Sequence, residues 1–379
     1  MHYGISYVMI TGMKISKYIL IFSGYNQRAV IAFLRTLEKN NITNYLIFAC
    51  SRDDTIFKTI YADKVYAVRK NKQLDLDEIR QLIFSAKEKK EFDTFLIPPS
   101  TEALNRFLLD HMSLLSSLGL ENVLVDKNLY ETISDKEKFS RLCVSYGMTV
   151  PEEIAFPPKF KKKFVAKPKT YFSGDGKAYA PVLITTADEY NHFIEVYQQN
   201  DFYYQQFLEG KSIYLLYYIT KSKKVYSFSQ ENLMQQPGGK SVLCAKTSTY
   251  HHTAIADVYK NMLLQVGYHG FVMIELRITA DNDYMIEANP RFWGPSQLFV
   301  DSGYNFFEIF LKEYGFLNDI DPEEPKVEVF YYWSGGFLSP DKKEPVAFGG
   351  FEKDFNPDFL IQNDIYKRPD TSQLYIDGD

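Results

Sequence analysis

The sequence predicts an α/β unit followed by α+β units, and two patterns along the chain support this fold class. In the first third, short apolar runs alternate with amphipathic helical patterns, which is typical of a parallel sheet with helices on its faces. In the last third, two apolar, strand-like runs flank a polar turn within residues 271–294, which indicates an antiparallel hairpin. The chain has 379 residues, more than one ordinary core needs, so we expect several domains.

The N-terminal unit is predicted from four apolar runs that are short enough to be buried strands. These strands are expected at residues 18–22, 45–50, 65–68 and 94–97. Helices are expected at residues 76–86, at 102–109, and after the first strand, where Val30, Phe33 and Leu37 share a face. The turn 23–26 follows the first strand, where parallel sheets bind ligands, but a plain chain reversal explains it equally well. It lacks the GxGxxG pattern, so no nicotinamide site is predicted.

The middle of the chain carries a capping signal and a glycine-rich loop. Ser134, with Glu137 three residues later, has the capping-box pattern and predicts a helix that ends near Gly147. After a proline-marked linker, residues 163–168 form a short expected strand that contains Lys167. The loop 170–177 follows, and its glycines allow a backbone to fold over a phosphate, although Gly-Asp-Gly is also an ordinary turn.

The remaining elements lead up to and beyond the hairpin. A second capping box, Thr186 with Glu189, opens another expected helix. Strands are expected at residues 202–208, 212–220 and 224–229, and helices at residues 254–266 and 295–311. Lys240, Lys246, His251 and His252 are the polar candidates near the loop 236–241; a solvent-facing role is the simpler reading for both histidines. Irregular structure or a small β appendage is expected from residue 330 onward.

The hairpin brings two acids together. If Thr279 and Asp283 close a three-residue loop, Glu275 lies opposite Glu287 on the same face, with Cβ atoms about 5 Å apart. Two like charges repel at this distance, and a divalent cation between them removes the repulsion. Asn289 is a suitable third ligand, and Arg291 could hold a phosphate oxygen. A solvated hairpin with chance acids is the weaker interpretation, because both glutamates interrupt apolar runs.

Composition excludes several classes of function. Net charge is −5 and no basic run dominates, so a nucleic-acid partner is not expected. No apolar run is long enough to span a bilayer, and Lys14 and Lys17 interrupt any signal-peptide pattern at the N-terminus. Three scattered cysteines without metal or redox spacing predict a cytoplasmic protein.

The hairpin also carries a resemblance to a known family. MIELR, followed by IEANPRFWG, is similar to the metal-binding signature of the ATP-grasp superfamily, most of all to the branch with carbamoyl-phosphate synthase and biotin carboxylase. The resemblance implies an ATP-grasp fold preceded by a Rossmann-like parallel-sheet domain. It divides the chain into an N-terminal domain (1–130), a linker helix and lid (131–205), a metal-binding subdomain (206–320) and an appendage (321–379). The appendage could shape the acceptor site or a subunit contact in a homo-oligomer.

The resemblance assigns roles to individual residues. Metal ligands for Mg²⁺ or Mn²⁺ would be Glu275, Glu287 and Asn289. ATP would be bound by Lys136, Lys167, Ser173, Gly174, Gln205, Gln206, Phe207, Leu208 and Ser212. Catalytic cations would be Arg291, Lys167 and Arg277. The chain departs from many relatives at Gln205, where an acid is common, and at Ser212, where a glutamate holds the ribose.

The implied activity is ATP-dependent ligation of two small molecules. A substrate carboxylate would attack the γ-phosphate to give an acyl phosphate, from which an amine would displace phosphate. One alternative is formation of carboxyphosphate from bicarbonate on the same fold. Another is a non-catalytic nucleotide-binding or interaction protein, which the residues at positions 205 and 212 make conceivable.

Overall fold

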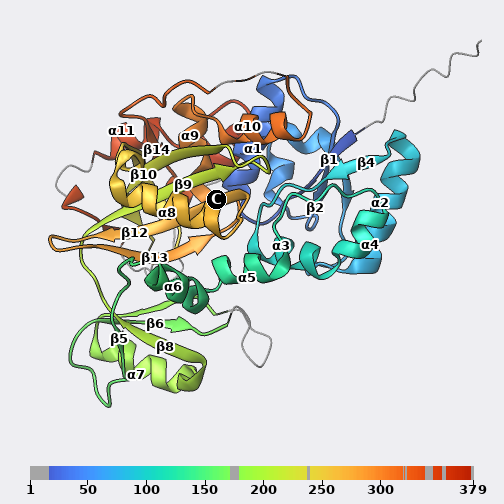
Figure 1. Cartoon of the computed structure of the whole chain (residues 1–379). Coiled ribbons are helices and arrows are strands. Elements are labelled where there is room, and N and C mark those ends of the chain that lie inside the picture. The colour runs from blue at the N-terminus through green and yellow to red at the C-terminus, as the bar shows by residue number, and fades with distance from the viewer. Residues whose placement is uncertain are drawn as a thin grey trace, which may run out of the picture.

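The N-terminal part of the protein is a parallel sheet with helices on both sides (Figure 1). The computed structural model describes residues 17–170, 179–236, 240–318, 320, 322–337, 345–351 and 356–376. Strands run in the order β3-β2-β1-β4, all parallel: β1 (Lys17–Phe22), β2 (Tyr45–Ala49), β3 (Val65–Val68) and β4 (Thr94–Leu96). The main helices are α1 (Gln27–Lys39), α2 (Leu76–Lys90), α3 (Glu102–Asp110) and α4 (Met112–Ser117). The four strands predicted from apolar runs are confirmed within one residue at each end.

Two helices connect this unit to the rest, and their boundary corrects one prediction. α5 (Lys127–Ser134) and α6 (Lys136–Ser145) meet at Asp135, whose side chain accepts hydrogen bonds from the backbone N–H groups of Glu137 and Lys138. The N-cap is therefore Asp135 and not Ser134. Ser134 instead ends α5, and its hydroxyl accepts a hydrogen bond from Arg106 at 2.9 Å. The predicted end of α6 is confirmed, because Gly147 follows it with a φ of 77°.

The lid is a small sheet with its own core, and it projects from the body of the molecule (Figure 1). Its strands have the order β5-β8-β6-β7: β5 (Glu153–Ile154), β6 (Phe164–Pro168), β7 (Val182–Ile184) and β8 (Phe202–Gln206). Helix α7 (Ala187–Val196) covers one side and starts at the predicted cap, where Thr186 accepts from the Glu189 N–H at 3.2 Å. The predicted loop contacts of Ser173 and Gly174 lie outside the described residues.

A larger antiparallel sheet forms the centre of the protein. In the described part of the chain it has seven strands: β9 (Lys211–Ile219), β10 (Val225–Gln235), β11 (Val242–Ser248), β12 (Gly270–Ile278), β13 (Asp283–Asn289), β14 (Phe330–Tyr332) and β15 (Val346–Ala347). The order is β13-β12-β9-β10-β11-β14, with β15 paired to β10. Helices α8 (Ala254–Gln265), α9 (Gln297–Asp301) and α10 (Phe306–Glu313) pack on it. Among all described helices, none is long and apolar enough to cross a membrane.

The hairpin β12–β13 has the predicted pairing at one end and a different pairing at the other. Glu275 lies directly opposite Glu287, as predicted. Nearer the turn, Ile278 pairs with Asp283, so the loop has four residues and not three. The two registers are reconciled by a bulge between these pairs, where Ile286 has no partner on β12.

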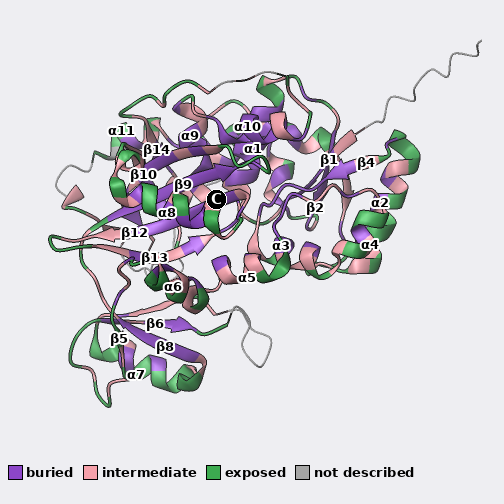
Figure 2. Cartoon of the chain, viewed as in Figure 1, coloured by how far each residue is buried: buried purple, intermediate pink, exposed green. Residues whose placement is uncertain are grey.

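The N-terminal unit and the central sheet share one hydrophobic core, whereas the lid does not belong to it. Phe33 of α1 lies 5.5 Å from Phe292 and 5.2 Å from Phe307, measured between ring centroids. Figure 2 shows the buried residues concentrated in α1, α10 and the central strands, with the outer faces of α2 and α7 exposed. We infer that these two units behave as one body, to which the lid is attached by short connections.

The C-terminal segment is part of this body and not a separate appendage. β14 and β15 extend the central sheet, and α11 (Pro357–Gln362) and α12 (Ser372–Ile376) follow. Asp370 forms a two-pronged ion pair with Arg35 of α1, with distances of 2.7 and 3.1 Å. Both side chains are nearly buried, at 10% and 13% exposure. The same guanidinium also bonds Gln297 and Thr371, so it joins three distant parts of the chain.

Asp370→Asn should destabilise the shared core strongly, because it leaves a buried guanidinium without its counter-charge. We expect a loss of about 3 kcal/mol in the free energy of unfolding, measured by urea titration with tryptophan emission as the signal. Glu209→Gln is the matched control, since its ion pair with Lys163 is exposed and should contribute no more than about 0.5 kcal/mol. Equal effects in the two variants would contradict this account.

Candidate functional site

Two opposed glutamates form the centre of the site. Glu275 on β12 and Glu287 on β13 are a directly paired couple, so their side chains project from the same face of the sheet. Glu275 is 5% exposed and the Glu287 side chain 21% exposed, so neither charge is well hydrated. Such a pair is stable only if cations lie close by.

Three cations surround the pair. Lys136, in the first turn of α6, forms an ion pair with Glu287. The Arg277 guanidinium donates to Glu275 at 3.1 Å. Lys167 comes from the lid strand β6 and is 4% exposed. Three elements far apart in sequence therefore place positive charge at one pair of carboxylates.

The bulge in β13 explains how Lys167 is held. Because Ile286 is unpaired, its carbonyl is free to accept a hydrogen bond, and the Lys167 ammonium donates to it at 2.8 Å. This contact links the lid to the hairpin β12–β13. Burial, together with the charge of Lys136, lowers the pKa of Lys167 to about 7, against the attraction of the two glutamates.

The two carboxylates are electrostatically unequal. Burial raises the pKa of Glu275, although Arg277 opposes this effect. Burial by itself would also raise the pKa of Glu287. The charge and hydrogen bond of Lys136, together with the hydrogen bond from Asn289, outweigh burial and lower this pKa to about 2. Glu287 is thus the firmly ionised member of the pair.

Asn289 and Arg291 continue the site beyond β13. The Asn289 amide nitrogen donates to Glu287 at 2.8 Å, and its oxygen accepts from Arg291 at 3.1 Å. On the other side of Glu275, Ser212 donates to the carboxylate at 3.3 Å and accepts from Asn232 at 2.9 Å. The glutamates are therefore embedded in a continuous polar network on one face of the sheet.

A cavity of about 400 Å³ lies between the lid and this face. Lys167, Glu275, Arg277 and Glu287 contribute to its wall, as does the connection 205–210 after β8. Residues 346–349 form a further side, and Phe348 lies against the Arg277 guanidinium at 4.5 Å from the ring centre. This volume is within the range of pockets that bind small molecules.

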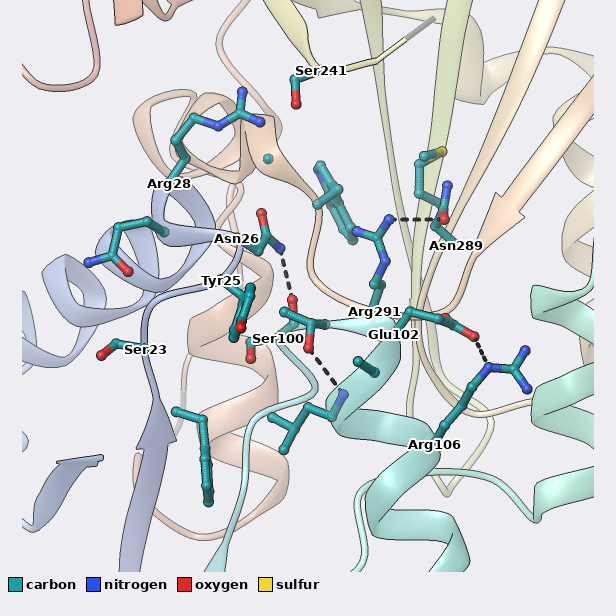
Figure 3. A pocket seen from close by; sticks show the side chains of 18 of the residues that line it. Ser23, Tyr25, Asn26, Arg28, Ser100, Glu102, Arg106, Ser241, Asn289 and Arg291 are labelled. Carbon is teal, nitrogen blue, oxygen red and sulfur yellow. Dashed lines mark hydrogen bonds and ion pairs between the residues drawn. The ribbon is translucent and has the colours of Figure 1, made fainter. Parts of the chain in front are cut away.

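A second cavity, of about 1130 Å³, opens on the other side of Glu287. Its wall includes Asn289 and Arg291 from the hairpin and the turn 23–26 from the N-terminal sheet (Figure 3). Asn26 has a left-handed backbone with φ of 49° and donates to the carbonyls of Ser100 at 2.8 Å and Phe292 at 3.1 Å. The turn is thus both a wall of the cavity and a clamp between the two units.

The donor set fits a hard divalent cation. The described residues contain no group of three or more His, Cys, Asp or Glu side chains that could hold a metal. Two carboxylates and the Asn289 oxygen would leave coordination positions to water and phosphate oxygens, which is how Mg²⁺ is commonly bound.

The structure brings together most, but not all, of the residues singled out from sequence. Lys136, Lys167, Glu275, Arg277, Glu287, Asn289 and Arg291 converge, and Gln205, Gln206, Phe207 and Leu208 line the smaller cavity. Ser212 is fully buried behind Glu275 and is not part of that cavity wall, because its hydroxyl bonds inward. Lys240 lines the larger cavity, whereas Lys246 pairs with Glu231 at 3.4 Å.

Sequence reasoning missed the contributions of the C-terminal segment and of Arg28. Phe348 and Trp333 reach the two cavities from strands and turns that follow the hairpin by 40 residues or more. No local pattern in the sequence links them to it. Arg28 offered one weak signal, because it directly follows the turn 23–26.

Comparisons with known proteins agree with this architecture. Residues 133–295 match the family model described as ATP-grasp domain. Biotin carboxylase of Campylobacter jejuni, solved in its β,γ-ATP complex, has a TM-score of 0.59 at 13% identity, covering 84% of this chain and 74% of that chain. N5-carboxyaminoimidazole synthetase of Staphylococcus aureus has a TM-score of 0.57 at 14% identity, covering 84% and 81%.

A third similar structure is the biotin carboxylase domain of 2-oxoglutarate carboxylase from Hydrogenobacter thermophilus, in complex with MgADP, ADP and bicarbonate. Its TM-score is 0.58 at 12% identity, covering 82% of this chain and 73% of that chain. A comparison with curated protein sequences gives no match. At these identities the likeness concerns the fold, and the fold predicted from the sequence is confirmed.

The two adjacent histidines are separate from the cluster of charged residues. His251 shares a hydrogen bond of 2.8 Å between its Nδ1 and the Ser229 hydroxyl, and its ring stacks on Phe228. Burial, and then the neighbouring His252, lower the pKa of His251 to about 4. Because the folded state holds the neutral form, its contribution to stability is full above pH 6.5 or so and is lost as the pH falls towards 4.

His251→Gln should therefore destabilise the protein at pH 7 by more than it does at pH 5. The measurement is the difference in thermal unfolding midpoint between the variant and the unchanged protein at both pH values. His192→Gln, at an exposed position, should leave the midpoint unchanged at each pH. A difference that is independent of pH would refute the assigned titration.

Proposed function

We propose that this protein is an ATP-dependent ligase that activates a substrate carboxylate and joins it to an amine, because residues 133–295 match the family model described as ATP-grasp domain. One observation carries the proposal. Glu287 belongs to the walls of both cavities, so a nucleotide in the smaller and an acid in the larger would meet at its carboxylate.

The smaller cavity would hold ATP. Its wall between Gln205 and Leu208 would supply backbone groups and an apolar side for the base, and Lys167 would supply positive charge. A divalent cation, when bound to Glu275, Glu287 and Asn289, would neutralise charge on the phosphates. With the nucleotide present, Lys136 would exchange part of its contact with Glu287 for a phosphate oxygen.

The chemistry would follow from the placement of charge at the junction of the cavities. The carboxylate oxygen of the acid attacks the γ-phosphorus, the bond to the β,γ-bridging oxygen breaks, and ADP leaves. Arg291 is fixed by Asn289 and by the Phe292 carbonyl at 2.9 Å, so its guanidinium is positioned before the substrate arrives. The amine then attacks the acyl carbon, phosphate leaves, and the amine loses a proton.

Carboxyphosphate formation from bicarbonate is the second candidate. It is favoured by the similarity to the Hydrogenobacter thermophilus domain, whose complex contains MgADP and bicarbonate. Against it stands the larger cavity, whose volume of about 1130 Å³ greatly exceeds the needs of bicarbonate alone. A purely nucleotide-binding role would leave that cavity, and the fixed arginine beside it, without a purpose.

Glu287→Gln should reduce ADP release by about 100-fold or more while leaving the fold intact, because it removes the ionised ligand of the metal. ADP release with pools of carboxylates and amines is the readout, and circular dichroism checks the fold. The control Glu231→Gln removes a carboxylate of the same sheet whose ion pairs, among the described residues, are with Lys211 and Lys246. Full activity in the Glu287 variant would refute the metal assignment.

The same assay separates the candidate functions. Release of ADP that requires both a carboxylate and an amine supports ligation. Release that depends on bicarbonate alone supports the carboxyphosphate route. Binding of ATP without ADP release under any combination supports the non-catalytic reading.

Phe348→Ala should weaken ATP binding several-fold, because it removes the ring that packs on Arg277 in the wall of the smaller cavity. Calorimetric titration with a non-hydrolysable ATP analogue measures the effect. Phe359→Ala is the matched control, since Phe359 lies in the same C-terminal segment but is 43% exposed and does not line either cavity. The same affinity in all three proteins would exclude a nucleotide contact by residues 346–349.

A further inference from the structure

The wall of the larger cavity carries more cations than acids, and several of these cations form no ion pair with a carboxylate of the described residues. Its wall contains six cations, namely Arg28, Arg69, Lys72, Arg106, Lys240 and Arg291. Its three acids, Glu102, Asp110 and Glu287, are each paired with a cation. By contrast, Arg28, Arg69, Lys72 and Arg291 form no ion pair with any carboxylate of the described residues.

Arg28 is held in a way that leaves one side of its guanidinium available. Its Nη1 group donates to the Val242 carbonyl at 3.1 Å and to the Tyr331 hydroxyl at 3.0 Å, which uses both of its hydrogens. One face stacks on the Trp333 ring at 3.8 Å. Among the described residues nothing accepts from Nε or Nη2, so three N–H donors remain, and two of them, the Nε–H and one Nη2–H, point along the same edge.

Gly294 leaves the space that the Arg28 guanidinium occupies. At Gly294 an added Cβ would lie 2.7 Å from Nη2 of Arg28, closer than real contacts allow. A glycine is therefore needed at 294 for the guanidinium to stay where it is. Figure 3 shows Arg28 from α1 and Arg291 from the segment after β13 both directed into the pocket.

The buried side-chain atoms of the same wall that lack a hydrogen-bond partner among the described residues can all act as donors. Within the described part of the chain, five residues that line the cavity have a buried side-chain atom without a hydrogen-bond partner, and each of these atoms can donate a hydrogen bond: Gln27, Arg69, Ser100, Trp293 and Trp333. A wall of cations and donors is complementary to a ligand that brings negative charge and acceptors.

We propose that the acid bound here carries a second anionic group, a carboxylate or a phosphate, and that the Nε–Nη2 edge of Arg28 grips it while the reacting carboxylate lies at Arg291. This rests on the proposed function for the identity of the reacting group. The two-pronged edge of an arginine matches the two oxygens of either anion. The contacts of Arg28 to Val242, Tyr331 and Trp333 use Nη1 and one face of the guanidinium, and they leave its Nε–Nη2 edge to a ligand.

The test uses the intrinsic emission of the protein without nucleotide. The chain has two tryptophans, and both Trp293 and Trp333 line the cavity. Succinate and inorganic phosphate should each change the emission in a saturable way at constant ionic strength, and the neutral analogue succinamide should not. The stronger of the two anions identifies the group that Arg28 prefers.

Three variants assign the effect. Arg28→Ala should weaken binding of the preferred anion about tenfold or more, the size expected for a lost charge-assisted pair of hydrogen bonds. Gly294→Ala should weaken it as well, although the net charge is unchanged. Arg80→Ala, which removes an exposed arginine of α2, should have no effect. Far-UV circular dichroism and thermal unfolding confirm that each variant is folded.

Anion binding at Arg28 can be tested separately from the proposed ligase reaction. Equal affinity in the Arg28 variant and the unchanged protein, a response to succinamide equal to that to succinate, or no response to either anion would overturn the proposal. Because the titration needs neither ATP nor turnover, a protein that binds the anion through Arg28 but releases no ADP would refute the ligase reaction alone. In an active protein, Arg28→Ala should raise KM for a dicarboxylate and leave KM for ATP unchanged.

Discussion

The site depends on holding two carboxylates face to face on neighbouring strands. Burial makes this arrangement unfavourable, so the surrounding elements are arranged to supply compensating charge. Lys136 comes from a helix, Lys167 from the lid and Arg277 from the same strand as Glu275, and each contributes a cation to one small volume. The cluster is thus a meeting point of three parts of the fold, and the lid is tied to the body through the carbonyl that the β13 bulge sets free.

The arrangement also explains why the protein has two cavities. The N-terminal unit and the central sheet share a core and keep the larger cavity between them, while the lid closes the smaller one from the opposite side. Glu287 stands in the wall common to both. A molecule on either side would reach the same carboxylate without passing through the other space, which is the geometry that transfer of a group between two bound substrates requires.

Local patterns were sufficient to predict the four strands of the N-terminal sheet, the hairpin and the opposed glutamates, because these depend on neighbours a few residues away, whereas β11 (Val242–Ser248) was not predicted. The pairing of Glu275 with Glu287 was predicted from a loop of the wrong length, and the bulge at Ile286 makes up the difference. Asp135 is the N-cap in place of Ser134, whose hydroxyl instead accepts from Arg106, a residue 28 positions away in sequence. Contacts of this kind could not be predicted, since they join segments whose proximity only the complete fold determines.

The tie between Arg35 and Asp370 spans nearly the whole chain, and residues 346–349 complete one cavity wall. A chain cut before residue 346 would therefore lose both the counter-charge of Arg35 and one wall of the smaller cavity.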